Sequence, residues 1–340
     1  MIKPGLLRFI LASLVVVFHV ARVVFVGTLA VYCFFILSGY WISLMYDSKY
    51  KKLDSPLQDF YMSRIYRLFP VYFLFAILAA VLVMFYDPSA VHTINHFSLV
   101  EKAHFWFSNL TLLGYNLLPV QPIAPAWSLD IELQFYILFP VMLVFLNNKA
   151  SRIAAVVFFG LVTLVVEVFL NKSFLHETVA VYLVYFIIGI CLNKDAISFN
   201  RRTEVICTGL FFLVLAVHYA VPSLFQEVRN SFSSYHLRFS ETACLLLIPM
   251  LANSVRVKSN KLDRNLGDIS YVLYLSHWIW FIPFNYYTQS LSSIQRLPYM
   301  VVYLVLTFSM AYVFYAYYDR PIEERRRRLA ELSKAQPSAA

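Results

Sequence analysis

The fold of this chain is decided by its first apolar run, residues 6–26, which has the sequence LLRFILASLVVVFHVARVVFV. The run is as long as the roughly twenty apolar residues that a helix needs to cross a bilayer. It carries an arginine near its start, Arg8, and a histidine deep inside it, His19. Titratable groups within a membrane span are costly and usually face a cavity or a partner. The run therefore predicts a membrane helix with one functional face.

The spacing of Arg8 and His19 places both on that face. At about 100° per residue the two side chains differ by only about 20° around the axis, and at about 1.5 Å per residue they lie roughly 16 Å apart. Arg8 alone is also explained as an interfacial anchor that reaches the lipid headgroups. His19 has no interface within reach. We therefore expect a narrow internal passage with Arg8 at one end and His19 at the other.

The composition supports a membrane protein throughout. Of the 340 residues, 60% are hydrophobic and only 14% are charged, whereas soluble domains are about 25% charged. The formal net charge of +9 is explained by basic cytoplasmic loops that face anionic lipid headgroups. No DNA- or RNA-binding motif accompanies these charges, so we expect the lipid bilayer and no nucleic acid as a partner.

The apolar runs, set against the Lys and Arg content of the loops, predict an all-α polytopic protein with about ten spans and both termini in the cytoplasm. One segment, near residues 105–118, is too short to cross and is expected to be re-entrant or interfacial. We expect residues 1–322 to form the transmembrane domain and residues 323–340 a basic, disordered cytoplasmic tail. The spans are expected near residues 6–26, 29–45, 68–86, 127–146, 153–170, 178–193, 204–220, 239–253, 267–288 and 299–318.

Two short motifs belong to the second and third spans. Ser38 and Gly39 are small enough to let a neighbouring helix or a ligand approach closely, and helix packing is the better interpretation. Arg64 and Arg67 are three residues apart and share a helix face at the predicted cytoplasmic boundary. Paired guanidinium groups bind phosphate well. Lipid phosphates and the phosphates of a substrate explain this pair equally.

The most polar entry to any span is WSLDIELQFY, residues 127–136. Ser128 or Asp130 can cap the predicted helix, and Glu132 falls in its first turn, where an acidic residue suits the helix dipole. Capping explains one acidic residue but not the whole polar group. On the predicted topology this cluster lies at the outer face, where it can meet His19.

A second intramembrane histidine, His277, follows in the ninth expected span. Ser270, Tyr274 and His277 lie at i, i+4 and i+7, so they form one polar stripe that faces inward. A satisfied hydrogen bond between helices and a catalytic role explain His277 equally well. The sequence shows neither a zinc-binding histidine pattern nor a phosphate-binding glycine loop.

Together these motifs resemble the acyltransferase-3 family, bacterial membrane O-acyltransferases that modify surface sugars. The acidic residue that members usually carry shortly before the arginine is missing here, which leaves open how the cytoplasmic end of the first helix is held. The matching pieces, in order, are Arg8-x10-His19, Phe34-Phe35-x-x-Ser38-Gly39, Arg64-x-x-Arg67-x-x-Pro70, Trp127-Ser128-Leu129-x-x-Glu132-x-Gln134-Phe135-Tyr136-x-x-x-Pro140 and Ser270-Tyr271-x-x-Tyr274-Leu275-x-His277.

The resemblance implies a membrane O-acyltransferase of the bacterial inner (plasma) membrane. The donor substrate would be cytoplasmic acyl-CoA, most often acetyl-CoA, and the acceptor a hydroxyl of a cell-surface or lipid-linked glycan. We expect no permanently bound cofactor and no metal. Some members carry an extracytoplasmic hydrolase-like domain that this sequence does not show. We therefore expect transfer to finish in the membrane domain or on a separate extracytoplasmic partner protein.

The roles that follow are hypotheses. A guanidinium at the inner boundary can hold a nucleotide phosphate, and the separation of Arg8 from His19 resembles the reach of a pantetheine arm. His19 would act as general base on the acceptor hydroxyl or carry the acyl group, and Glu132 would orient His19 or grip the acceptor. The expected phosphate ligands are Arg8, Arg64 and Arg67, and the expected acceptor contacts are Trp127, Ser128, Tyr136 and His277.

Two other classes remain open from the residues alone. In a transporter of polar solutes, His19 and His277 would relay protons beside the substrate, although the paired, broken spans typical of transporters are not evident. In a polysaccharide assembly complex, the chain would be a non-catalytic membrane partner. Uptake without acyl-CoA would favour the first class, and acyl transfer by the purified protein would exclude the second.

Overall fold

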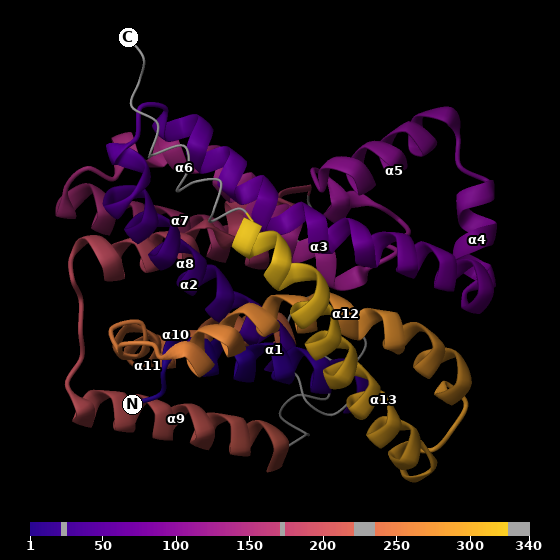
Figure 1. The fold of residues 1–340 in the computed structure, drawn as a ribbon. Coiled ribbons are helices and arrows are strands. Elements are labelled where there is room, and N and C mark those ends of the chain that lie inside the picture. The colour runs from indigo at the N-terminus through magenta and orange to yellow at the C-terminus, as the bar shows by residue number, and fades with distance from the viewer. Residues whose placement is uncertain (22–25, 171–173, 221–234, 326–340) are drawn as a thin grey trace.

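The computed structural model describes residues 1–21, 26–170, 174–220 and 235–325. Every regular element within these ranges is a helix (Figure 1), which confirms the predicted all-α architecture. The last described helical stretch reaches Arg325, so the expected tail begins inside a helix, and residues 326–340 lie outside the described ranges.

The chain forms long helices joined by short connections and a few single turns. The single turns are Tyr50–Lys52, Tyr115–Leu117, Ala124–Ala126 and Phe174–Glu177, and a π-helical turn spans Tyr315–Asp319. The helices are α1 (Pro4–Ala21), α2 (Val26–Ser48), α3 (Pro56–Tyr86), α4 (Pro88–Asn95), α5 (Leu99–Thr111), α6 (Trp127–Phe145), α7 (Lys149–Phe169), α8 (Val179–Lys194), α9 (Arg201–Ala220), α10 (Tyr235–Leu246), α11 (Ile248–Ser254), α12 (Lys261–Thr288) and α13 (Ser293–Phe314).

Seven helices in the described part of the chain are long and apolar enough to cross a membrane, namely α1, α2, α3, α6, α7, α9 and α13. The apolar helix α8 has only 16 residues, and α12 is long but polar in its first half. These features confirm a polytopic membrane protein. The count of ten spans stays a prediction.

Two boundaries differ from the expected spans. Helix α3 begins at Pro56 rather than near residue 68, because a proline at the start fits the first turn of a helix. Arg64 and Arg67 therefore lie inside α3. The expected span 239–253 is two helices that meet at Leu247, where Pro249 in the first turn of α11 cannot continue the hydrogen bonding of α10.

The segment expected to be re-entrant or interfacial folds back onto the start of α6. Helix α5 ends at Thr111; its C-cap residue Leu112 has a positive φ of 63°, and Gly114 has a φ of 70°. The Asp130 carboxylate then accepts hydrogen bonds from Gly114 N at 3.2 Å and Asn116 N at 3.0 Å. Neither Asp130 nor Ser128 caps α6, because the N-cap position is Ala126, which forms no side-chain cap. Asp130 instead anchors the returning loop.

Helices α2 and α8 pack together through two glycines (Figure 1). A Cβ atom on Gly39 would lie 2.0 Å from the backbone oxygen of Phe186, and one on Gly189 would lie 2.0 Å from the backbone oxygen of Ile36. Such distances are far below any van der Waals contact, so only glycine permits this approach. The packing interpretation of Gly39 is confirmed.

Helix α1 lies between α2 and α12 and contacts both. Its first turn is held by a carboxylate from the other end of the sequence, Asp263 on α12. Asp263 accepts hydrogen bonds from Leu6 N at 2.8 Å and Gly5 N at 3.2 Å, and Ser259 Oγ donates to it at 2.6 Å. The unpaired N–H groups of a helix start attract an acceptor of this charge. Asp263 thus holds the end of the first helix that the sequence left unexplained.

Candidate active site

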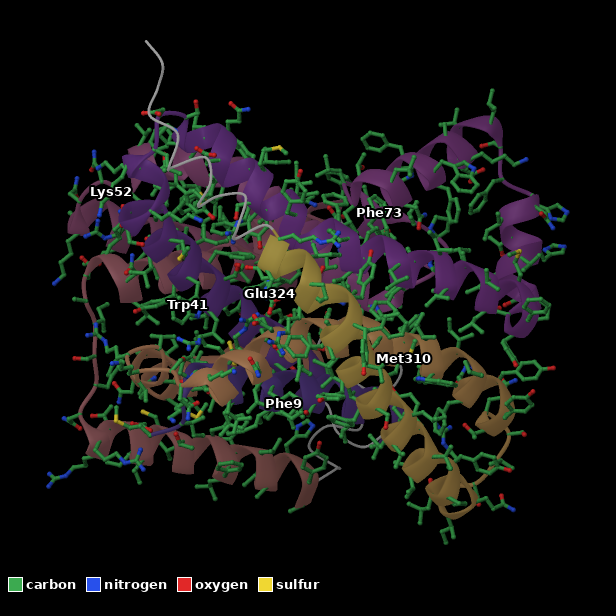
Figure 2. The ribbon with its side chains drawn as sticks, viewed as in Figure 1. Phe9, Trp41, Lys52, Phe73, Met310 and Glu324 are labelled. Carbon is green, nitrogen blue, oxygen red and sulfur yellow. The ribbon has the colours of Figure 1, made fainter. Side chains whose placement is uncertain are left out.

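An elongated cavity of about 580 Å³ lies among α1, α2, α3, α6 and α12. Along α2 its wall runs from Val31 to Met45, a distance of about 21 Å at 1.5 Å per residue. Trp41, labelled left of centre in Figure 2, belongs to this wall. The polar lining includes Arg8, Ser38, Arg64, Arg67, Ser128, Glu132, Tyr136, Asp268, Ser270, Tyr271 and Tyr274.

The carboxylate of Glu132 is held inside this cavity by two hydroxyl groups. Ser38 Oγ donates to Glu132 Oε1 at 2.7 Å, and the Tyr136 hydroxyl donates to the same oxygen. Ser38 therefore serves the cavity, while its neighbour Gly39 serves helix packing. Charge-assisted hydrogen bonds of this kind fix a carboxylate in place. The second oxygen, Oε2, is left for a ligand.

Two arginines of α3 line the same cavity and are held by different partners. Arg64 Nη2 donates to the Tyr50 hydroxyl at 3.1 Å, and the guanidinium lies 5.7 Å from the centre of the Tyr136 ring. Arg67 forms an ion pair with Asp268 at 3.7 Å and lies 5.4 Å from the centre of the Tyr271 ring. Aromatic contacts hold such planar cations and leave N–H groups free for an anion.

Arg8 enters the cavity from α1. Arg67, Asp268 and Glu132 are near enough to act on its charge, and it makes no ion pair with a carboxylate in the part of the chain that the structure describes. The structure therefore brings Arg8, Arg64 and Arg67 together around one space. The cavity lining carries four arginines and three carboxylates, so its formal charge is positive, which suits a phosphorylated ligand. These residues are Arg8, Arg64, Arg67, Arg264, Glu132, Asp263 and Asp268.

The deep end of the cavity, farthest from Pro4 and Ser259, is closed by Tyr274. Its hydroxyl is 2.7 Å from Ser128 Oγ and donates to the backbone oxygen of Pro125 at 2.9 Å, so the start of α6 is tied to the middle of α12. The ring of Phe34 packs edge-on against Tyr274 at 6.3 Å. This cluster stops the cavity about one turn before His277.

His19 lies on the far side of that closure. Its ring is stacked on His277, with centres 5.2 Å apart, and also contacts Trp278 at 5.2 Å and Phe281 at 5.5 Å. The continuous passage expected from Arg8 to His19 is therefore wrong for this structure, because the tethered Tyr274 ring separates the two ends. The sequence could not reveal this, since the tether joins residues 146 positions apart.

The predicted polar stripe of α12 is confirmed, because Ser270, Tyr274 and His277 are all buried. His277 Nδ1 lies 3.3 Å from the backbone oxygen of Leu273, which can only accept, so this nitrogen carries the hydrogen when the ring is neutral. His277 Nε2 is then an acceptor, and it is buried without a hydrogen-bond partner among the described residues. It is available to a hydroxyl.

The remaining predicted site residues divide between two places. Ser128 and Tyr136 line the cavity, as does Glu132. Glu132 is not paired with His19, because its hydrogen bonds go to Ser38 and Tyr136. Trp127 instead packs against Phe35 and Tyr182, with ring centres 6.3 and 5.6 Å apart.

Three residues of the site were missed by sequence reasoning. Tyr50 and Asp268 hold the two arginines of α3, and Asp263 holds the helix that carries Arg8. Asp268 was the most visible of them, since it stands between Gly267 and the polar stripe in α12. Tyr50 and Asp263 lie in segments whose most evident feature is their lysine and arginine content.

A family model described as an acyltransferase domain matches residues 3–316. This chain belongs to the acyltransferase-3 family. The match covers every residue of the cavity, which makes the arginines, the carboxylate and the histidine pair part of the family domain rather than an addition to it. No solved structure matches this family member.

The curated relatives of this family member are O-acetyltransferases by name. "O-acetyltransferase OatA" of Staphylococcus aureus (strain NCTC 8325 / PS 47) is 24% identical over 352 residues, which cover 95% of this chain and 57% of the relative. "Putative peptidoglycan O-acetyltransferase YrhL" of Bacillus subtilis (strain 168) is 32% identical over 139 residues, which cover 38% of this chain and 22% of the relative. "Peptidoglycan O-acetyltransferase OatA" of Listeria monocytogenes is 30% identical over 149 residues, which cover 41% of this chain and 24% of the relative. This chain aligns with little more than half of the first relative and less of the others.

Proposed function

We propose that this chain is an O-acyltransferase of the bacterial inner membrane. It moves an acyl group, most simply acetyl, from cytoplasmic acyl-CoA to a hydroxyl of a cell-surface or lipid-linked glycan. The observation that carries the proposal is the elongated, positively charged cavity around Arg8, Arg64 and Arg67, which ends one helical turn from two stacked histidines. The names of the relatives support a peptidoglycan-type glycan as acceptor.

In this proposal the three arginines hold the phosphates of the donor, and the thioester arm extends toward Tyr274. The acyl carbon can reach His19 only when the Tyr274 ring turns away from Ser128 and Pro125. Loss of two hydrogen bonds makes that movement costly, by roughly 1–3 kcal/mol. The bound donor must supply this energy, which ties opening of the deep end to an occupied cavity.

The chemical step needs one base. His19, or His277 through its free Nε2, accepts the proton of the acceptor hydroxyl while the oxygen attacks the thioester carbonyl. The carbon–sulfur bond breaks, and the sulfur leaves with a proton as free CoA. In the alternative route His19 takes the acyl group first and passes it to the hydroxyl. Imidazole is suited to either role near neutral pH.

The test is replacement of His19 and Arg8 by alanine in a producing strain, followed by mass spectrometry of the surface glycan. We expect both variants to lose glycan acylation while inserting normally. His96→Ala is the matched control, because His96 is an exposed histidine outside the cavity, and it should keep full acylation. Normal acylation by inserted His19→Ala protein would exclude a catalytic role for that ring.

A proton-coupled transporter is the rival outcome. Reconstituted vesicles that take up a polar solute without acyl-CoA, and that lose this uptake in the His19 variant, would favour it. Release of CoA by the purified protein in the presence of a glycan acceptor would support the transferase.

A further inference from the structure

The end of the cavity opposite Tyr274 is a mouth formed where α1 and α12 begin. Pro4 of α1 and Ser259, just before α12, line it. Arg264, on the first turns of α12, also lines the cavity and is exposed. Arg264 lies five residues after Ser259, which corresponds to about 7 Å along the axis of α12. It stands farther out than Arg8 and the α3 arginines.

The charge of Arg264 is available to a ligand. Its neighbour Asp263, the nearest carboxylate in sequence, is turned the other way and occupied by the N–H groups of Gly5 and Leu6. Across the described ranges, the Arg264 guanidinium forms no ion pair or side-chain hydrogen bond. This differs from Arg64 and Arg67, which are tied to Tyr50 and Asp268.

An aromatic ring on a different helix lines the same cavity. Trp41 of α2 is half-buried, lines the cavity and packs edge-on against Tyr40 at 5.3 Å. Figure 2 shows Trp41 left of the centre of the fold. A cation and a flat apolar face in one cavity match a phosphorylated nucleoside.

We propose that Arg264 and Trp41 form a subsite for the 3′-phosphoadenosine end of the donor, with Arg264 on the 3′-phosphate and Trp41 stacked on the adenine. This inference rests on the proposed acyl-CoA donor. It adds the two residues by which the protein would distinguish CoA from thioesters that lack the nucleotide. The order of the lining agrees with the order of groups in CoA. The nucleoside lies at the mouth, the diphosphate at Arg8 and Arg67, and the thioester at the closed end.

The test is a comparison of two ligands that differ only in the 3′-phosphate. Dissociation constants for CoA and 3′-dephospho-CoA are measured on the purified full chain in lipid nanodiscs. The wild-type protein should bind CoA roughly 10-fold or more tightly, the value of a charge-assisted hydrogen bond. Arg264→Gln should bind both ligands equally, at the weaker constant.

Three further variants make the comparison specific. Arg202→Gln removes an exposed arginine outside the cavity and should keep the wild-type ratio. Trp41→Ala should weaken both ligands alike, roughly 5-fold or more, since stacking does not depend on the 3′-phosphate. Arg264→Lys keeps the charge but loses the planar fork, so it should give an intermediate ratio even if Arg264→Gln fails to insert.

The outcomes separate the two proposals. A wild-type ratio in both Arg264 variants, or a wild-type protein that binds the two ligands equally, would overturn the subsite and leave the acyl-CoA donor standing. A wild-type protein that binds neither ligand would overturn the donor and the subsite together.

Discussion

Removal of the Asp263 carboxylate should loosen the helix that carries Arg8. The side chain is buried, with 3% of its surface exposed, and it accepts two backbone N–H groups of α1 and the Ser259 hydroxyl. A hydrogen bond to a charged group contributes about 1.5–3 kcal/mol. With Asp263→Ala, the buried N–H of Gly5 and the partly buried N–H of Leu6 lose their charged acceptor, so we expect a loss of about 3 kcal/mol in stability. Asp263→Asn keeps one acceptor oxygen and should lose less.

The measurement is the thermal midpoint of the purified protein in detergent, read together with CoA binding. A loss of about 3 kcal/mol corresponds to a fall of roughly 4–6 °C for a chain of this size class. Asp54→Ala is the matched control, because Asp54 is an exposed acidic residue of the loop before α3. If Asp263→Ala melts within about 1 °C of the wild type, the carboxylate does not hold α1 and the reasoning fails.

Three more changes follow from contacts described above. Gly189→Ala should lower the free energy of unfolding by about 3 kcal/mol or more, because the new Cβ would overlap the α2 backbone. Gly209 has open space around it, so Gly209→Ala should be neutral or slightly stabilising. Thermal midpoints of the two variants measure this difference. The hydrogen bond from Arg152 holds the pKa of Asp195 below its ordinary value, so this stabilisation is present at neutral pH and is lost as the pH falls below roughly 4. Melting curves between about pH 3 and 7 should show that loss, and Asp195→Asn should abolish it. Tyr274→Phe removes both tethers of the closed end, so it should speed the hydrolysis of bound acetyl-CoA; an unchanged rate would mean that this hydroxyl does not close the cavity.

Patterns with a short repeat were predictable from the sequence. The stripe of Ser270, Tyr274 and His277 needed only helical periodicity, and the burial of all three confirms it. The gathering of Arg8, Arg64 and Arg67 was also foreseen, because each lies at the basic end of an apolar run. The stripe depends on neighbours within two turns of one helix, where geometry is fixed by the backbone. The arginines required only that each lie at the same predicted boundary of the membrane.

Contacts between distant segments were not predictable. The first helix was expected to present Arg8 and His19 to one passage, but the Tyr274 tether to Ser128 divides their surroundings. Glu132 was expected near His19 and is held by Ser38 and Tyr136 instead. In each case the depth of one helix relative to another decides the contact, and one sequence carries no information on that depth.

The glycine contact between α2 and α8 has a consequence for how the cavity changes size. Backbones that touch at Gly39 and Gly189 cannot slide past each other without a steric clash. Helix α2 is therefore the wall of the cavity that is held in place. Widening to admit a bulky nucleotide then falls to α1, α3 and α12, which are coupled by side-chain contacts such as Asp263 with Leu6 and Arg67 with Asp268. In the proposed nucleoside subsite, Trp41 would then belong to the fixed wall, and Arg264 to a helix whose packing leaves it freer to shift.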